Sequence, residues 1–213
     1  MTRYLKALGL VIVAAIALTV MATSTGSADG TEEFTASEYP AILHGMHTTA
    51  SVYTFAGGRK FECSGGTGTG ELTGSSETIK VNPKPTECKF GMLPATTTTS
   101  CAEGLDHYDT IFKKTVTKCK KGYKHNVKAF SNAEHTTTIC DYEVAETEGE
   151  ISLENLGGTS GIKVTHEVTG VPYTRVSGTL ANCGPASGSA TFTATTVITA
   201  KNEGGEPIGF DIG

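Results

Sequence analysis

Apolar and polar residues alternate along most of the chain. The clearest case is ATFTATTVITA, residues 190–200, where Phe192 and Ile198 fall on one face and threonines dominate the other. The segment Ile162–Val168 alternates in the same way and places His166 on its apolar face. Successive side chains of a strand point to opposite faces, so this period of two predicts strands that bury one face.

Short alternating segments of this kind recur, separated by turn residues such as Gly57-Gly58 and Gly204-Gly205. Threonine is abundant, and as a β-branched residue it fits a pleated surface. Many short strands punctuated by Gly and Pro are typical of a sandwich or barrel. The sequence therefore predicts an all-β fold, a single disulfide-stapled β-sandwich or barrel-like domain. The predicted strands are Ser51–Phe55, Lys60–Cys63, Thr78–Val81, Ala95–Cys101, Tyr108–Thr117, Val127–Phe130, Thr136–Val144, Gly149–Leu153, Ile162–Val168, Tyr173–Leu180, Ala190–Ala200 and Ile208–Ile212.

One segment of low complexity interrupts this pattern, SGGTGTGELTGSS at residues 64–76. It lacks the G-x-G-x-x-G spacing of a phosphate-binding loop, and neither a buried apolar strand nor a helix frames it. We therefore expect a mobile turn and an edge strand here.

The first residues show the three-part layout of a secretory signal peptide. Arg3 and Lys6 form a basic region, an apolar run follows over residues 7–20, and small residues come next. We expect a signal-peptide helix that is cleaved after Ala28, with cleavage after Ala22 as the alternative. An uncleaved anchor is the other reading, but the apolar run is short for a spanning helix, which needs about 20 residues.

Cleavage would divide the chain into a signal peptide over 1–28 and a single secreted, β-rich domain over 29–213. The whole chain has 17 basic and 22 acidic residues, and removal of the signal leaves 15 basic against 22 acidic. Such a surface repels nucleic acid and anionic lipid, so we expect neither as a partner, and no membrane association after cleavage. The predicted location is secreted, or extracellular.

Six cysteines in an exported chain predict three disulfides. No pair has the C-x-x-C spacing of a redox site or the close ligand spacing of a structural zinc site. Fifteen connectivities are possible, and spacing ranks them without selecting one. The connectivity that ranks first has two disulfides between cysteines close in sequence and one between distant cysteines. The predicted pairs are Cys88–Cys101, Cys119–Cys140 and Cys63–Cys183.

Histidines are the other candidates for chemistry. His44 and His47 could share a metal on one helical turn, but on a strand they would point to opposite faces. His107, between Asp106 and Tyr108, and His166 are candidate bases for a small secreted hydrolase. The G-x-S-x-G turn of a serine nucleophile is missing, and no cofactor motif is present. We therefore predict no catalytic, cofactor-binding or metal-binding residues.

The chain from residue 34 to 212 resembles a group of threonine-rich, six-cysteine secreted proteins of unknown function from Gram-positive soil bacteria. The resemblance implies a secreted, disulfide-stapled β domain and nothing catalytic. The segments that show it are FTASEYPAILHG (34–45), KFEC (60–63), IKVNPKPTECKFGMLPATTTTSC (79–101), GVPYTRVSG (170–178), NCG (182–184) and TATTVITAKNEGGEPIGFDI (193–212).

Together these features predict a secreted, non-enzymatic module, structural or binding, of the extracellular space or the cell envelope. Its ligand, its extracellular or cell-wall partner and its oligomeric state are not specified by the sequence. Few aromatic residues are available for stacking on sugar rings, which argues against carbohydrate binding of that kind. The alternatives are a hydrolase that uses His107 or His166, and a weak metal-binding module that uses His44 and His47.

Overall fold

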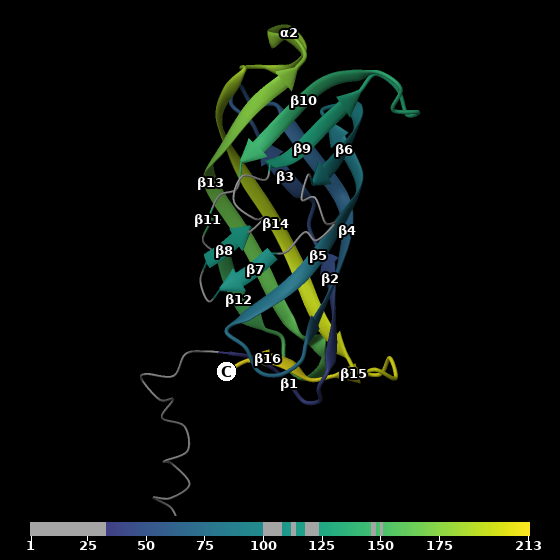
Figure 1. Cartoon of the computed structure of the whole chain (residues 1–213), viewed down its shortest axis with the longest axis vertical. Helices are drawn as coiled ribbons and strands as arrows, with labels where there is room; N and C mark the ends of the chain where they lie inside the picture. Colours follow the sequence, from purple (N-terminus) through teal and green to yellow (C-terminus); the bar gives the residue numbers. More distant parts are fainter. Residues whose placement is uncertain (1–32, 100–107, 112–113, 118–123, 146–147, 150) are drawn as a thin grey trace, which may run out of the picture. The chain divides into compact units, whose positions relative to one another are not determined.

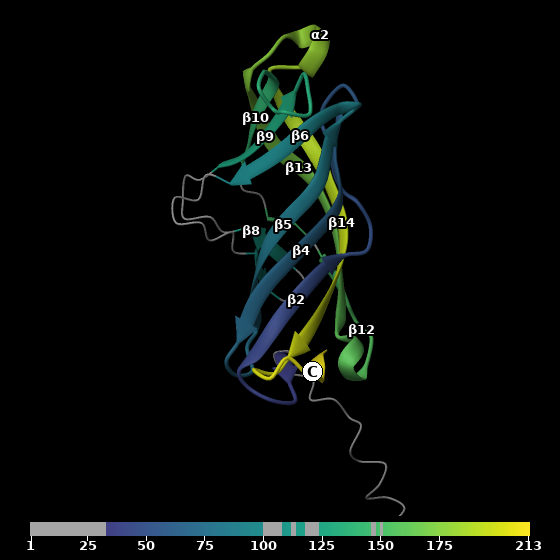
Figure 2. The same ribbon diagram turned by 90° about the vertical axis from the view of Figure 1, so that its right-hand side faces the viewer.

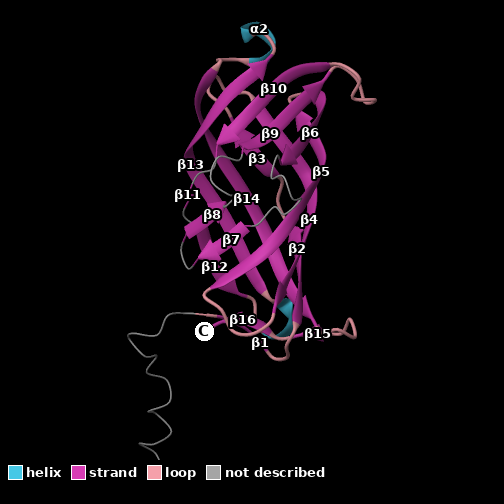
Figure 3. Cartoon of the chain, in the orientation of Figure 1, coloured by secondary structure: helices cyan, strands magenta, loops and turns pink. Residues whose placement is uncertain are grey.

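Strands make up nearly all of the regular structure in the computed structural model of the chain (Figures 1 and 3). The structure describes residues 33–99, 108–111, 114–117, 124–145, 148–149 and 151–213. The all-β prediction is thereby confirmed. The strands are β1 (Phe34–Ala36), β2 (Ala41–His47), β3 (Ser51–Thr54), β4 (Lys60–Leu72), β5 (Thr78–Phe90), β6 (Leu93–Thr99), β7 (Tyr108–Ile111), β8 (Lys114–Thr117), β9 (Lys124–Phe130), β10 (Thr138–Ala145), β11 (Glu148–Gly149), β12 (Ile151–Asn155), β13 (Ile162–Ser177), β14 (Ser187–Lys201), β15 (Pro207–Ile208) and β16 (Phe210–Ile212).

Two short helical turns accompany the strands, the 3-10 turn η1 (Gly158–Ser160) and the single α-helical turn α2 (Leu180–Cys183). Among the described residues, no helix is long and apolar enough to cross a membrane. The predicted signal peptide and its cleavage site at Ala28 lie outside the described residues. Residues Glu32–Gly213 form one compact unit.

The strands of the large sheet pair in a closed circuit. The circuit runs β4–β5–β6–β9–β10–β13–β14–β2 and returns to β4, and every pairing in it is antiparallel. Figure 2 shows β2, β4 and β5 side by side in this circuit. Of the two predicted arrangements, this closure corresponds to the barrel-like one, because the edges of the sheet meet each other.

The remaining strands either extend the large sheet by pairing with strands of this circuit or form a separate small sheet. β3 pairs with both β14 and β4, β12 with β13, and β15 with β14. β7 pairs with β5 and continues through β8 to β11. A separate two-stranded sheet joins β1 to β16, where the amide of Glu33 donates to the carbonyl of Gly213 at 2.8 Å and the reverse bond measures 3.1 Å.

Two apolar clusters fill the inside of the circuit. The first contains most of the buried aromatic residues that the structure describes, including Phe55 and Tyr142, whose ring centroids lie 4.6 Å apart. The second joins Phe34 and Phe210 of the small sheet to aliphatic residues of the large one. Its buried members are Phe34, Ala41, Leu43, Leu72, Ile79, Val81, Ile151, Ile162, Val164, Ile198, Ala200, Ile208 and Phe210.

Most predicted strands are present, but three differ from the prediction. The predicted strand Tyr108–Thr117 is two strands, β7 and β8, that fold back on each other with Ile111 opposite Lys114. The predicted strands over 162–168 and 173–180 are one strand, β13, which runs through a register irregularity between Val168 and Val171. Strand β2 was not predicted, although Ala41, Leu43 and Gly45 alternate inward along it.

The prediction for the glycine-rich segment, residues 64–76, was wrong as far as Leu72. Up to that residue the segment is neither a mobile turn nor an edge strand. Strand β4 runs through it and pairs with β2 on one side and β5 on the other. The glycines permit close approach of these neighbours. A Cβ on Gly70 would overlap the Lys80 carbonyl oxygen, and one on Gly68 would lie 2.6 Å from Cγ1 of Val81.

Candidate functional site

Two disulfides connect the described cysteines, and neither is a predicted pair. Cys63 is bonded to Cys88, which lies directly opposite it on β5 with the two Cα atoms 3.9 Å apart. Cys140 of β10 is bonded to Cys183 of α2, with 5.7 Å between Cα atoms. The predictions Cys88–Cys101, Cys119–Cys140 and Cys63–Cys183 are therefore wrong. Cys101 and Cys119 lie outside the described residues.

The error has a physical cause in the length of β4 and β5. Both strands are 13 residues long and pair over most of that length, so the nearest cysteine in space to Cys63 is the one directly across the ladder. The spacing argument assumed short hairpins, in which Cys88 would face residues that follow it. The predicted strand ended at Cys63, whereas β4 continues to Leu72. The long pairing with β5 that aligns Cys63 with Cys88 was therefore not foreseen.

The second disulfide belongs to a network that holds α2 against the strands. The Tyr142 hydroxyl donates to the carbonyl of Cys183, and the Arg175 guanidinium donates to the carbonyl of Gly184. The Arg59 guanidinium donates to the carbonyl of Ala181 at 2.8 Å. These bonds satisfy carbonyl groups at the end of the helical turn that have no partner within the helix. The network fixes α2 against β10 and β13.

The alternative of a metal site at His44 and His47 is not supported, because these residues lie on opposite faces of β2. Positions 41, 43 and 45 of this strand are buried, and His47 continues that inward series. His44 is in the alternate series, opposite Thr199 on β14 and Thr69 on β4. The strand geometry therefore rules out a site shared by these two imidazoles, as the period of two requires.

Instead, the structure places His47 near His166. His47 lies opposite Thr196 and His166 lies opposite Ala194, so the two histidines flank β14 from either side, two residues apart along it. Both belong to inward-facing series. The ring of His166 meets that of Phe192 edge-on, with centroids 6.0 Å apart. A Cβ on Gly66 would lie 2.6 Å from Nδ1 of His47, so the imidazole packs directly over that glycine.

Both imidazoles are harder to protonate than a free histidine. Burial lowers the pKa of His47. Burial, and secondarily the charge of His47, lower the pKa of His166 to about 4. Nδ1 of His47 is buried and has no hydrogen-bond partner among the described atoms. Both shifts favour the neutral form of the imidazole.

Neither predicted hydrolase base is seen in a catalytic arrangement. His166 belongs to the inward series of β13, opposite Ala194 on β14 and Ile151 on β12, and its ring meets that of Phe192. His107 lies outside the described residues. Within the described part of the chain, no group of three or more His, Cys, Asp or Glu residues could hold a metal ion.

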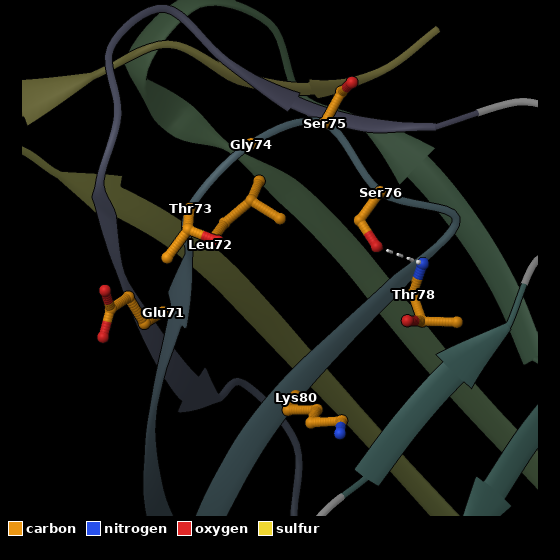
Figure 4. A pocket seen from close by; sticks show the side chains of 8 residues that line it. All are labelled: Glu71, Leu72, Thr73, Gly74, Ser75, Ser76, Thr78 and Lys80. Atoms are coloured by element: carbon orange, nitrogen blue, oxygen red, sulfur yellow. Dashed lines mark hydrogen bonds between the residues drawn. The ribbon is translucent and has the colours of Figure 1, made fainter.

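A shallow pocket lies at the turn between β4 and β5 (Figure 4). Its volume is about 330 Å³, and Glu71, Thr73, Ser76, Thr78 and Lys80 are among the residues that line it. The amide of Thr78 donates to Oγ of Ser76 at 3.2 Å. Figure 4 shows the Glu71 carboxylate turned away from the Lys80 side chain. The pocket offers hydroxyl groups and separated charges, and it does not bring an acid, a base and a nucleophile together.

The outward face of β14, β2, β4 and β5 carries a more extended arrangement. We call it the polar face and define it by three rows of cross-strand neighbours. The most exposed apolar side chain on it is Met46, at 62% exposure. The rows are Thr199, His44, Thr69 and Asn82; Val197, Met46, Thr67 and Lys84; and Lys201, Ile42 and Glu71.

Sequence reasoning did not identify the polar face or the His47–His166 pair. Both depend on which strands are neighbours; β2 was not predicted as a strand, and the second half of β4 was predicted as a turn and an edge strand, not as a strand paired on both sides. The alternation of AILHGMH was a usable signal, because it places His44 and Met46 together on one side. The pairing of distant strands has no equivalent local signal.

Comparisons with known proteins give no family assignment. No family model matches the chain, and neither a search of curated proteins nor one of solved structures finds a match. The resemblance to threonine-rich, six-cysteine secreted proteins therefore stays a prediction.

Proposed function

We propose that this protein is a secreted, non-enzymatic binding module that contacts an extracellular or cell-envelope partner through the polar face. The two disulfides fit an extracellular location, since such bonds persist in oxidising compartments. The observation that carries the proposal is the polar face itself, four neighbouring strands that present hydroxyl, amide, imidazole and ammonium groups in aligned rows.

The geometry of the polar face suits an extended partner. Neighbouring strands lie about 4.8 Å apart and alternate residues on one strand about 6.8 Å apart, so the three rows span roughly 14 Å in each direction. Thr67, Thr69 and Lys84 are exposed, and Met46 stands among them. Met46 lies between Val197 on β14 and Thr67 on β4. An exposed apolar group with hydrogen-bonding groups beside it is a common composition for a contact surface.

The residues at the described inward positions favour binding over catalysis as the working hypothesis. Catalysis needs a concave site where a nucleophile or base meets substrate. The described inward positions are occupied by the two apolar clusters and the histidine pair, while the pocket at the β4–β5 turn is shallow. A small secreted hydrolase that uses His107 or His166 remains the competing hypothesis, and the experiment below separates the two.

The test is co-sedimentation of the purified protein with the insoluble cell-wall fraction of the organism that produces it. We expect the wild-type protein to sediment with the wall and Met46→Glu to stay mostly in solution, because the added carboxylate disrupts the centre of the polar face. Val176→Glu is the matched control, since Val176 on β13 is similarly exposed, at 57%, and lies outside the three rows.

Two results would contradict the proposal. Equal sedimentation of Met46→Glu and the wild-type protein would show that the polar face is not the contact surface. Release of soluble wall fragments that continues with time and stops in His166→Gln would support the hydrolase instead.

A further inference from the structure

The end of the circuit that carries α2 displays apolar side chains to solvent. We call this end the α2 tip and define it by α2, the β3–β4 turn (55–59) and the β5–β6 turn (91–92). The four most exposed large apolar residues of the described chain are Met92, Leu180, Met46 and Val176, at 98%, 68%, 62% and 57%. Met46 belongs to the polar face, whereas Met92 and Leu180 lie in the α2 tip. Val176 is next to the last residue of β13, the strand that leads into α2.

Hydrogen bonds show that the segments of the α2 tip meet, although they are distant in the sequence. The amide of Gly91 donates to the carbonyl of Lys60 at 3.1 Å, which joins the β5–β6 turn to the start of β4. The guanidinium of Arg59 donates to the carbonyl of Ala181 at 2.8 Å, which joins the β3–β4 turn to α2. Figure 2 shows α2 at the upper end of the strands, above β6. Met92 and Leu180 are therefore exposed at the same end of the molecule.

The α2 tip is basic, although acidic residues outnumber basic ones in the whole chain by 22 to 17. The stretches 54–61, 88–95 and 173–189, which form the tip and the strand ends that enter it, contain no acidic residue. Their basic residues are Arg59, Lys60, Lys89 and Arg175. Two carboxylates lie in the adjoining described segments, Glu62 opposite Lys89 in the β4–β5 ladder and Glu134 in the loop between β9 and β10. Four cations against these two carboxylates leave a net positive charge.

We propose that the α2 tip docks on the surface of a lipid bilayer that contains anionic phospholipid. Met92 and Leu180 enter the boundary between the head groups and the acyl chains, while Arg59 and Lys60 face the lipid phosphates. Both cations are exposed, and Arg59 has five N–H donors, of which the Ala181 carbonyl engages one. Exposed apolar side chains next to basic ones are the composition that binds an anionic lipid interface.

The shape of the α2 tip favours lipid over a protein partner or a second copy of this chain. A stable protein interface buries about 800 Å² on each partner around a continuous apolar core. The tip instead presents single apolar side chains on separate turns. A fluid bilayer surface accepts such side chains one by one, and the depth needed is only about 5–10 Å.

The local charge of the tip also outweighs the net charge of the chain, which by itself predicts repulsion from anionic lipid. At 0.1 M salt, charges further apart than about 10 Å are largely screened from each other. The acidic residues on the remainder of the unit therefore contribute little to a contact made by the tip alone.

The test is sedimentation of the secreted protein with vesicles of phosphatidylcholine and phosphatidylglycerol in equal parts, at 0.1 M salt. We expect the wild-type protein to bind, and Met92→Glu and Leu180→Glu each to raise the Kd at least tenfold, because each loses an inserted apolar group and adds a repelled charge. Lys60→Ala should raise the Kd about fivefold, the contribution of one basic residue near such a surface. Met46→Glu is the matched control, since it makes the same substitution at an exposed methionine on the polar face and should bind as the wild-type protein does.

Three results would overturn the inference. These are no sedimentation of the wild-type protein with the vesicles, equal binding by Met92→Glu and the wild-type protein, and equal binding to vesicles of phosphatidylcholine alone. The outcome is separate from that of the proposed function, because Met46→Glu should lose the cell wall and keep the vesicles, whereas Met92→Glu should lose the vesicles and keep the wall.

Discussion

The glycines of β4 give the sharpest stability prediction, and Gly70→Ala is the substitution that tests it. Gly70 lies directly opposite Val81 in the β4–β5 ladder. An added Cβ would overlap the carbonyl oxygen of Lys80 and lie 3.0 Å from its carbonyl carbon and 3.4 Å from the Cα of Val81. These atoms are backbone, so they cannot rotate away as a flexible side chain would.

The size of the effect follows from two opposing contributions. Replacing glycine by alanine in a strand normally stabilises by about 0.5–1 kcal/mol, because the unfolded chain loses freedom. Forcing an extra methyl group into packed structure costs about 1–3 kcal/mol, and weakening one or two ladder hydrogen bonds costs about 1 kcal/mol each. The second contribution dominates, so we expect a net loss of about 2 kcal/mol.

The assay is thermal unfolding followed by circular dichroism, with Gly74→Ala as the control. Gly74 lies in the turn after β4, and nothing is within 4 Å of the position where its Cβ would be. A net loss of about 2 kcal/mol corresponds to a Tm lower by roughly 4–8 °C in a chain of this size. If Gly70→Ala melts within a degree of Gly74→Ala, then β4 and β5 are not packed as closely as described, and the reasoning fails.

Further predictions concern the disulfides and the closure at α2. Non-reducing peptide mapping should recover Cys63 linked to Cys88 and Cys140 linked to Cys183, and a Cys88–Cys101 peptide would contradict this pairing. Replacing Cys140 and Cys183 together by alanine should cost up to about 4 kcal/mol in urea unfolding, because the bridge closes a separation of 43 residues. Tyr142→Phe should cost about 1–2 kcal/mol, since the carbonyl of Cys183 loses its buried donor. In spectrophotometric titration Tyr142 should ionise well above the ordinary value of 10, because burial, and then Tyr173, raise its pKa to about 12; ionisation near 10 would contradict its burial.

Local pattern predicted the fold class well, because a half-buried strand shows its period of two in any sequence. Strand β14 is the clearest example, since its alternating apolar residues are the ones that face the core. The local pattern did not predict the full length of strand β4, because most of its inward positions after Cys63 are glycines and not apolar side chains. The glycines of β4 face inward because Val81 and the β5 backbone fill the space that side chains would occupy.

The candidate site was less predictable than the fold. The argument that His44 and His47 point to opposite faces of a strand needed only the sequence, and the structure confirms it. The partner of His47 depends on β14 lying between β2 and β13, which is a property of strand order. The prediction for Cys63 and Cys88 failed for a different reason, since these residues lie on consecutive strands and are aligned by a ladder longer than the one predicted. Residues that meet across non-consecutive strands leave no periodic signal.

The small sheet of β1 and β16 has a consequence for protein engineering. Glu33 and Gly213 are joined by two backbone hydrogen bonds, so a polypeptide that enters this unit at one residue leaves it at an adjacent point. A host protein could therefore receive residues 33–213 within a surface loop without its own loop ends being forced apart. The same adjacency would allow a short peptide to join the two residues, with new ends cut at the Gly57-Gly58 turn.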